Sequence, residues 1–189
     1  MRYLKTYKLF ENRIQPILLD LEDNVDNELI SKIQNLLPSG RILEISCGNG
    51  ADSIKLNELG YDVTATDFTK EYVDYVNQYL PCIQHDTREK FPFNDKEFDL
   101  VYSRLGLHYF SEEELKSIFG EISRLTNQYL VFTVKLANDN LNTGKVILDE
   151  SKWKELVSDK FNIISSEVKE GILYNDKSKW LEIIASTRN

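Results

Sequence analysis

The sequence contains few of the residues from which disulfide frameworks, metal sites and catalytic triads are built. Its 189 residues include two cysteines, Cys47 and Cys82, and two histidines. Two cysteines form neither a disulfide framework nor the paired spacing of a zinc site. With so few histidines and cysteines, the sequence also lacks a convincing metal cluster or a Ser-His-Asp type triad. We therefore expect no bound metal, and any chemistry must depend on other residues.

Long apolar runs and clusters of basic residues are also missing. The N-terminus, MRYLK, lacks the long apolar stretch of a signal peptide, and no segment approaches membrane-spanning length. Lysine and arginine number 23 against 31 aspartate and glutamate residues, which gives a formal net charge of -8. Without a basic stripe, broad binding to nucleic acid is disfavoured. We expect a cytoplasmic protein without a membrane or nucleic-acid partner; the oligomeric state stays open.

Hydrophobic patterning predicts strands that alternate with helices along one domain, residues 1–189. No repeat, linker or low-complexity tract divides the sequence. Such alternation favours a parallel sheet with right-handed crossovers, and the last two strands are expected to form an antiparallel C-terminal hairpin. The predicted fold is α/β, a Rossmann-like three-layer α/β/α sandwich with a seven-stranded, mostly parallel sheet. Its strands are expected at residues 41–45, 62–66, 82–85, 98–102, 129–134, 161–168 and 180–186.

The most informative segment is ILEISCGNG, residues 42–50, which is typical of a strand, a glycine turn and a helix start. In a doubly wound sheet, ligands bind beyond the carboxyl ends of the strands. The glycines allow the backbone to approach a ligand, and the helix start presents free N–H groups to it. Asp67 ends the next predicted strand, where a carboxylate can accept both ribose hydroxyls. The order of these features predicts a site for a nucleoside-containing cofactor.

The acidic and aromatic residues of this region also have purely structural interpretations. Glu44 can brace the turn or meet a cationic ligand group. Asp67 can serve as the acid before the next helix. Phe68 can cover one face of an adenine or pack as an ordinary aromatic. Asp86 can accept a bond from an adenine amino group, with the Thr87 N–H on a ring nitrogen, or it can cap a turn.

In their order, these segments resemble the class I S-adenosylmethionine-dependent methyltransferases, particularly small bacterial members of the tellurite-resistance or metabolite type. EISCGNG at 44–50 is similar to the family's acidic-x-Gly-x-Gly-x-Gly signature, with Ser46 in place of the first glycine. Asp67 matches the ribose acid. Residues 82–86, 91–93 and 98–101 resemble the adenine acid and the fourth strand, and residues 103–110 resemble the loop that follows. The resemblance covers roughly residues 38–135, about half of the chain.

The resemblance implies that the cofactor is S-adenosyl-L-methionine and that its methyl group is transferred to a small-molecule acceptor. Displacement at a sulfonium depends chiefly on positioning and desolvation, with a base only where the nucleophile carries a proton. The cofactor would be bound by residues of the turn and of the loops that follow the second, third and fourth strands: Glu44, Ser46, Cys47, Gly48, Gly50, Asp67, Phe68, Asp86, Thr87 and Ser103.

The loop after the fourth predicted strand contains the candidates for catalysis. His108 is the best candidate for a general base, although it can also be a loop histidine held by backbone bonds. Tyr109 and Arg104 are weaker candidates for substrate contact, and Arg104 can instead pair with a surface acid. The aromatic N-terminal stretch, residues 1–24, is a candidate lid over the cofactor.

Two other functions share part of the pattern. A nicotinamide-dependent oxidoreductase has the same turn and the same acid, but it needs a later third glycine where Asp52 and Ser53 stand. A cofactor-binding regulatory or partner protein without catalysis would fit Ser46 and the lack of an obvious base.

Overall fold

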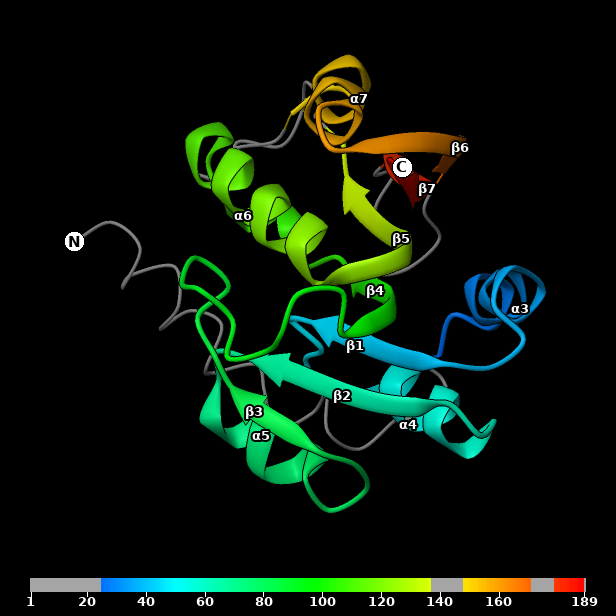
Figure 1. Ribbon diagram of the computed structural model, residues 1–189, viewed down its shortest axis with the longest axis vertical. Coiled ribbons are helices and arrows are strands. Elements are labelled where there is room, and N and C mark those ends of the chain that lie inside the picture. The colour runs from blue at the N-terminus through cyan, green and yellow to red at the C-terminus, as the bar shows by residue number, and fades with distance from the viewer. Residues whose placement is uncertain (1–24, 137–147, 171–178, 189) are drawn as a thin grey trace.

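A seven-stranded sheet with helices on both faces forms the centre of the molecule (Figure 1). The computed structural model describes residues 25–136, 148–170 and 179–188. The candidate lid (1–24), the loop at 137–144 and the turn at 175–176 lie outside the described residues. The described elements are, in chain order, α3 (Asn27–Leu36), β1 (Arg41–Ile45), α4 (Ala51–Glu58), β2 (Asp62–Asp67), α5 (Lys70–Val76), β3 (Cys82–Gln84), β4 (Phe98–Arg104), the 3-10 helix η2 (Leu107–Tyr109), α6 (Glu112–Leu125), β5 (Thr126–Lys135), α7 (Glu150–Ser158), β6 (Phe161–Glu170) and β7 (Lys179–Thr187).

The strand order is β3-β2-β1-β4-β5-β7-β6. Strands β1 to β5 pair in parallel, and β7 pairs antiparallel with both β5 and β6. This confirms the predicted mostly parallel sheet with its antiparallel C-terminal hairpin. The last strand in sequence is inserted between β5 and β6, so β6 forms the edge. The order reverses between β1 and β4, and a doubly wound sheet binds ligands beyond the carboxyl ends of such strands.

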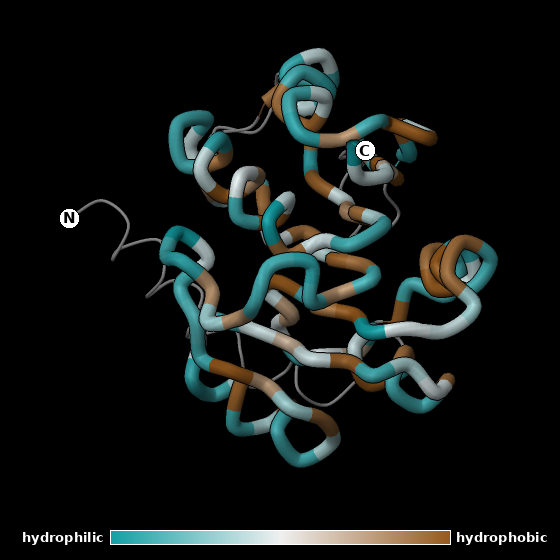
Figure 2. The backbone as a smooth tube through the Cα atoms, viewed as in Figure 1, coloured by the Kyte–Doolittle hydropathy of each residue, from teal (hydrophilic) through white to brown (hydrophobic). Residues whose placement is uncertain are grey.

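Two apolar layers hold the helices against the sheet. One layer joins α3, α4 and α5 to strand residues such as Ile42 and Leu100. The other layer joins α6 and α7 to Leu43 and Val101, the residues that directly follow Ile42 and Leu100 in the strands. Successive residues of a strand point to opposite faces of the sheet. These strands carry apolar residues on both faces because helices cover both faces of the sheet. Figure 2 shows the apolar segments gathered along the central strands.

The end of α6 differs from the expectation. The sequence predicts a loop at residues 126–128 and a strand from Tyr129, but β5 starts at Thr126, directly after the helix. Thr126 pairs with Phe98 of β4, and its hydroxyl donates to the Ile122 carbonyl at 2.6 Å. Because Thr126 completes the last helical turn and also starts the strand, no loop separates α6 from β5. The polar residues Asn127 and Gln128 that follow it led the sequence analysis to predict a loop.

Candidate functional site

The turn between β1 and α4 is built from residues in left-handed conformation. Ser46, Gly48 and Gly50 have φ values of 60°, 56° and 71°. The Cys47 N–H donates to the Thr66 carbonyl of β2 at 3.0 Å, which anchors the turn to the neighbouring strand. Gly50 is required for space as well as conformation, because a Cβ there would lie 2.5 Å from Val76 Cγ2. The turn at the carboxyl end of β1 therefore requires glycine at position 50.

Asp67, the last residue of β2, is bound to this turn. Its Oδ2 accepts from the Gly48 N–H at 2.9 Å, and its Oδ1 accepts from the Thr69 N–H at 2.8 Å, at the start of α5. Burial raises the pKa of Asp67, and these backbone bonds oppose the rise. Each carboxylate oxygen can accept a second bond. The carboxyl group thus holds two loops together and retains acceptor capacity for ligand hydroxyls.

The residues predicted to hold adenine lie in the segments that follow β2 and β3. The Phe68 side chain is 44% exposed, so it is not part of the core. Asp86 accepts from the Arg88 N–H at 3.0 Å and forms an ion pair with the Arg88 guanidinium, which lowers the pKa of Asp86. Thr87 is buried, and its hydroxyl lies 3.4 Å from the Ser46 hydroxyl. Asp86 therefore caps its turn, the structural alternative, in the arrangement observed.

A buried polar network lies between β1, α4 and β4. Glu44, only 2% exposed, accepts a hydrogen bond from the Ser53 hydroxyl. Asp52 accepts from the Tyr102 hydroxyl at 2.6 Å and pairs with Arg104 Nε at 2.5 Å. Arg104 thus pairs with a buried aspartate. This ion pair fastens the end of β4 to the first turn of α4, beside the glycine turn.

The electrostatics of this network follow from its burial. Desolvation raises the pKa of Glu44 to about 8, and the negative charge of Asp52 adds to this effect. Burial alone would lower the pKa of Arg104, but the Asp52 carboxylate outweighs it and the net change is upward. At neutral pH, Glu44 is therefore mostly a neutral acid beside a charged arginine, which suits it to bracing the turn.

Ser103 lies at the end of β4, and His108 and Tyr109 lie in the loop that follows. His108 lies in η2, is 1% exposed, and its ring centroid is 4.5 Å from that of Tyr109. Ser103 is buried at the carboxyl end of β4, and its hydroxyl has no hydrogen-bond partner among the described residues. Leu105 connects the two parts of this loop with a left-handed φ of 60°. His108 is thus close to the site in sequence and topology but sits in the packed interior.

The two cysteines, which are far apart in sequence, meet in the structure. Both are free thiols, and the Sγ atoms of Cys47 and Cys82 are 3.9 Å apart. The contact with Cys82 and the burial raise the pKa of the Cys47 thiol. The side chain of Cys47 therefore points into the interior, and only its backbone belongs to the turn.

No group of three or more histidine, cysteine, aspartate or glutamate residues within residues 25–136, 148–170 and 179–188 could hold a metal ion. No helix of the described chain is both long and apolar enough to cross a membrane.

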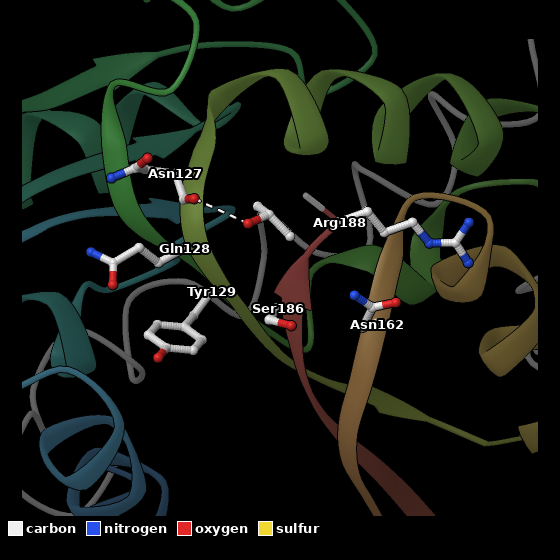
Figure 3. A pocket seen from close by; sticks show the side chains of 7 residues that line it. Asn127, Gln128, Tyr129, Asn162, Ser186 and Arg188 are labelled. Atoms are coloured by element: carbon white, nitrogen blue, oxygen red, sulfur yellow. Dashed lines mark hydrogen bonds between the residues drawn. The ribbon is translucent and has the colours of Figure 1, made fainter.

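A hollow of about 750 Å³ lies elsewhere on the molecule (Figure 3). It is lined by residues at the starts of β5 and β6 and the end of β7, among them Tyr129, Asn162 and Arg188. These lie at the opposite end of the sheet from the glycine turn, so the hollow is separate from the candidate site.

Sequence reasoning missed three residues that shape the site: Asp52, Tyr102 and Gly106. Acidic residues are common in the first turn of a helix because they interact favourably with the helix dipole. The sequence therefore did not indicate that Asp52 pairs with Arg104. Tyr102 resembled ordinary strand core. Gly106 lies opposite the turn because the loop after β4 meets the loop after β1, and no local sequence pattern predicts that contact.

Comparisons with known proteins find methyltransferases among the proteins similar to this chain. Residues 42–128 match the model of a methyltransferase domain family. The magnesium-protoporphyrin O-methyltransferase of Rhodobacter capsulatus is 23% identical over 131 residues, 65% of this chain and 57% of that protein. The malonyl-acyl-carrier-protein O-methyltransferase of Buchnera aphidicola is 33% identical over 106 residues, 53% of this chain and 40% of that protein. The chain thus spans about half the length of these relatives.

A solved structure has the same fold. The Burkholderia thailandensis 1,6-didemethyltoxoflavin-N1-methyltransferase, with bound 1,6-didemethyltoxoflavin and S-adenosylhomocysteine, superimposes with a TM-score of 0.75 at 14% identity, covering 100% of this chain and 86% of that one. The segment that matches the methyltransferase domain model includes the turn and Asp67, so this part of the chain is similar to a methyltransferase domain.

Proposed function

We propose that this protein transfers the methyl group of S-adenosyl-L-methionine to a small-molecule acceptor. The observation that carries the proposal is the bond between Asp67 and the Gly48 N–H, which joins the ribose acid to the glycine turn. The relatives at this level of similarity are methyltransferases, and the Burkholderia enzyme binds S-adenosylhomocysteine together with a small heterocycle.

The residues of the turn have the properties that cofactor binding requires. A Cβ at Gly48 would meet no described atom within 4 Å, so the space over this backbone is open. We assign the methionine part of the cofactor to Ser46, Gly48 and Gly50, and the ribose hydroxyls to Asp67. Because nearly half of the Phe68 side chain is exposed next to Asp67, it is available to cover an adenine face.

The buried network changes the roles of two candidates. Arg104 is held by Asp52, so we assign it to holding the end of β4 rather than to the substrate. Glu44 is held by Ser53, so we assign it to bracing the turn. We still assign Asp86 and Thr87 to the adenine. To accept a bond from the adenine amino group, the Asp86 carboxylate would have to give up part of its bonding to Arg88.

Catalysis by positioning suits this site. The leaving group of a sulfonium needs no proton, so the protein must mainly align the acceptor and exclude water. We keep His108 as the proposed base and Tyr109 as a neighbour that orients its ring, at 4.5 Å between centroids. The cytoplasmic location stays a prediction, as do the single domain over residues 1–189 and the lid.

Calorimetric titration with S-adenosylmethionine and S-adenosylhomocysteine tests cofactor binding directly. We expect both to bind, with NADH as a control that does not. No heat of binding for either up to millimolar concentration contradicts the proposal, and binding of NADH instead favours the oxidoreductase alternative.

Transfer of a labelled methyl group to the small-molecule fraction of a cell extract then separates enzyme from binding protein. Label that accumulates over many turnovers supports catalysis. Tight binding of the cofactor without any transfer to small molecules contradicts the activity and favours the regulatory alternative.

A further inference from the structure

Ser46 stands in the turn where the family resemblance leads one to expect glycine. Its φ of 60° is left-handed, a conformation that costs a residue with a Cβ about 1 kcal/mol or more. Its side chain also contacts two loops at once. The hydroxyl lies 3.4 Å from the Thr87 hydroxyl after β3, and the Cβ lies close to Gly106 in the loop after β4.

Gly106 is glycine for reasons of space and not of conformation. Its φ and ψ of -89° and -41° are right-handed helical values that any residue adopts. A Cβ at this position would lie 2.5 Å from Ser46 Cβ, 2.9 Å from Ser103 Oγ and 3.0 Å from Ser46 Oγ. Ser46 Cβ is fixed to the backbone, so no rotation of a side chain can relieve the shortest contact. Gly106 therefore provides the room that Ser46 needs.

We propose that Gly106 is a positioning residue for the cofactor turn: by lacking a Cβ, it lets the Ser46 side chain lie between the loops after β1, β3 and β4 and fix them relative to one another. The inference rests on the proposed function, because these loops carry the residues assigned to the cofactor. A glycine in place of Ser46 would lose this connection, whereas a larger residue in place of Gly106 would push the turn out of place.

Ser103 provides independent support for a junction that serves a ligand. Its hydroxyl is fully buried beside the same gap and has no hydrogen-bond partner among the described residues. A buried hydroxyl without a hydrogen-bond partner lowers the free energy of unfolding by about 1–3 kcal/mol, so stability alone does not account for a serine at position 103. The hydroxyl of Ser46 in the turn and that of Ser103 at the end of β4 thus both lie beside Gly106, where a Cβ would contact them.

The test is a double-mutant cycle read by calorimetric titration with S-adenosylhomocysteine and by thermal unfolding. The Gly106→Ala variant should bind about tenfold or more weakly, the size expected of overpacking a filled site. Ser46→Gly combined with Gly106→Ala should regain affinity to within about threefold of Ser46→Gly alone, because the shortest contact is gone.

Two matched controls make the cycle specific. Ser46→Ala combined with Gly106→Ala keeps the clashing Cβ, so it should stay as weak as Gly106→Ala alone. Gly120→Ala lies in α6, where a Cβ would meet no described atom within 4 Å, and it should leave binding unchanged. Wild-type affinity in Gly106→Ala, or equal rescue by Ser46→Gly and Ser46→Ala, would overturn the proposal.

The outcomes remain informative if a variant or the proposed function fails. If Gly106→Ala does not fold, a folded double variant with Ser46→Gly supports the coupling, and a double variant that is also unfolded refutes it. If the wild-type protein binds no S-adenosylhomocysteine, the proposed function fails and with it the role in cofactor positioning. The unfolding temperatures then still report whether Ser46 and Gly106 are coupled.

Discussion

The Gly48 N–H donates to the Asp67 carboxylate across 2.9 Å, so the acid that ends β2 directly supports the turn that follows β1. Asp67 ends β2 and Gly48 lies in the turn after β1, and these neighbouring parallel strands have their carboxyl ends at one edge of the sheet. A cofactor that binds both would find them already aligned, and their alignment reduces the ordering cost of binding.

Asp67→Asn should weaken the binding of S-adenosylhomocysteine by about 10- to 100-fold, because charge-assisted bonds to ligand hydroxyls are lost. Calorimetric titration measures the change. Asp62→Asn, at the exposed start of the same strand, is the matched control and should bind normally. Unchanged affinity in Asp67→Asn would remove the ribose assignment.

Glu44→Gln should change how stability depends on pH. Since the pKa of Glu44 is raised from 4.5 to about 8 by burial, the native state keeps a proton that the unfolded state loses between these values. The stabilisation is therefore complete below pH 4.5 and is lost as the pH rises through 8. Urea unfolding across this range should show a shallower decline in the glutamine variant. Parallel curves for both proteins would contradict the raised pKa.

Asp52→Ala should destabilise the fold by about 3–5 kcal/mol, because it removes the buried carboxylate that pairs with Arg104 and accepts from the Tyr102 hydroxyl. Denaturant unfolding measures the loss. Asp74→Ala breaks the exposed pair with Lys70 and should have little effect, since such pairs contribute little. A similarly small effect of both substitutions would mean that the network does not hold α4 to β4.

His108→Asn should lower methyl transfer by about 10²-fold or more, as expected for loss of a general base, while S-adenosylhomocysteine binds normally. Rates measured with an acceptor from the extract screen give the comparison. His85→Asn is the control, because His85 is half-buried in the loop after β3 and should not affect the rate. An unchanged rate in His108→Asn excludes the base role.

Ser111→Ala should destabilise the protein by about 1 kcal/mol, since Ser111 and Glu114 form a reciprocal capping box at the start of α6. Thermal unfolding gives the measure. Ser31→Ala, whose hydroxyl bonds back to the Asn27 carbonyl within α3, should be neutral or slightly stabilising. Equal effects at both positions would argue against the capping box as a source of stability.

Most of the sheet could be predicted because its signals are local. The apolar run Arg41–Ile45 and the Ser111–Glu114 capping box were located correctly, since each depends on residues close together in the chain. The start of β5 at Thr126 was missed, because its pairing with Phe98 is a distant contact. The binding roles of Asp67, Asp86 and Phe68 stay predictions. A carboxylate or an aromatic ring at a strand end can bind a ligand, but it can equally well stabilise a turn.

The sequence by itself determined the class of fold and the resemblance to methyltransferases, because hydrophobic periodicity and the order of short motifs can be recognised without any knowledge of distant contacts. Only the tertiary structure decided which polar groups meet. It placed Asp52 against Arg104, Cys47 against Cys82, and Gly106 against Ser46. The two residues of each pair belong to different elements or loops, and the distance between them depends on how the whole sheet twists and packs.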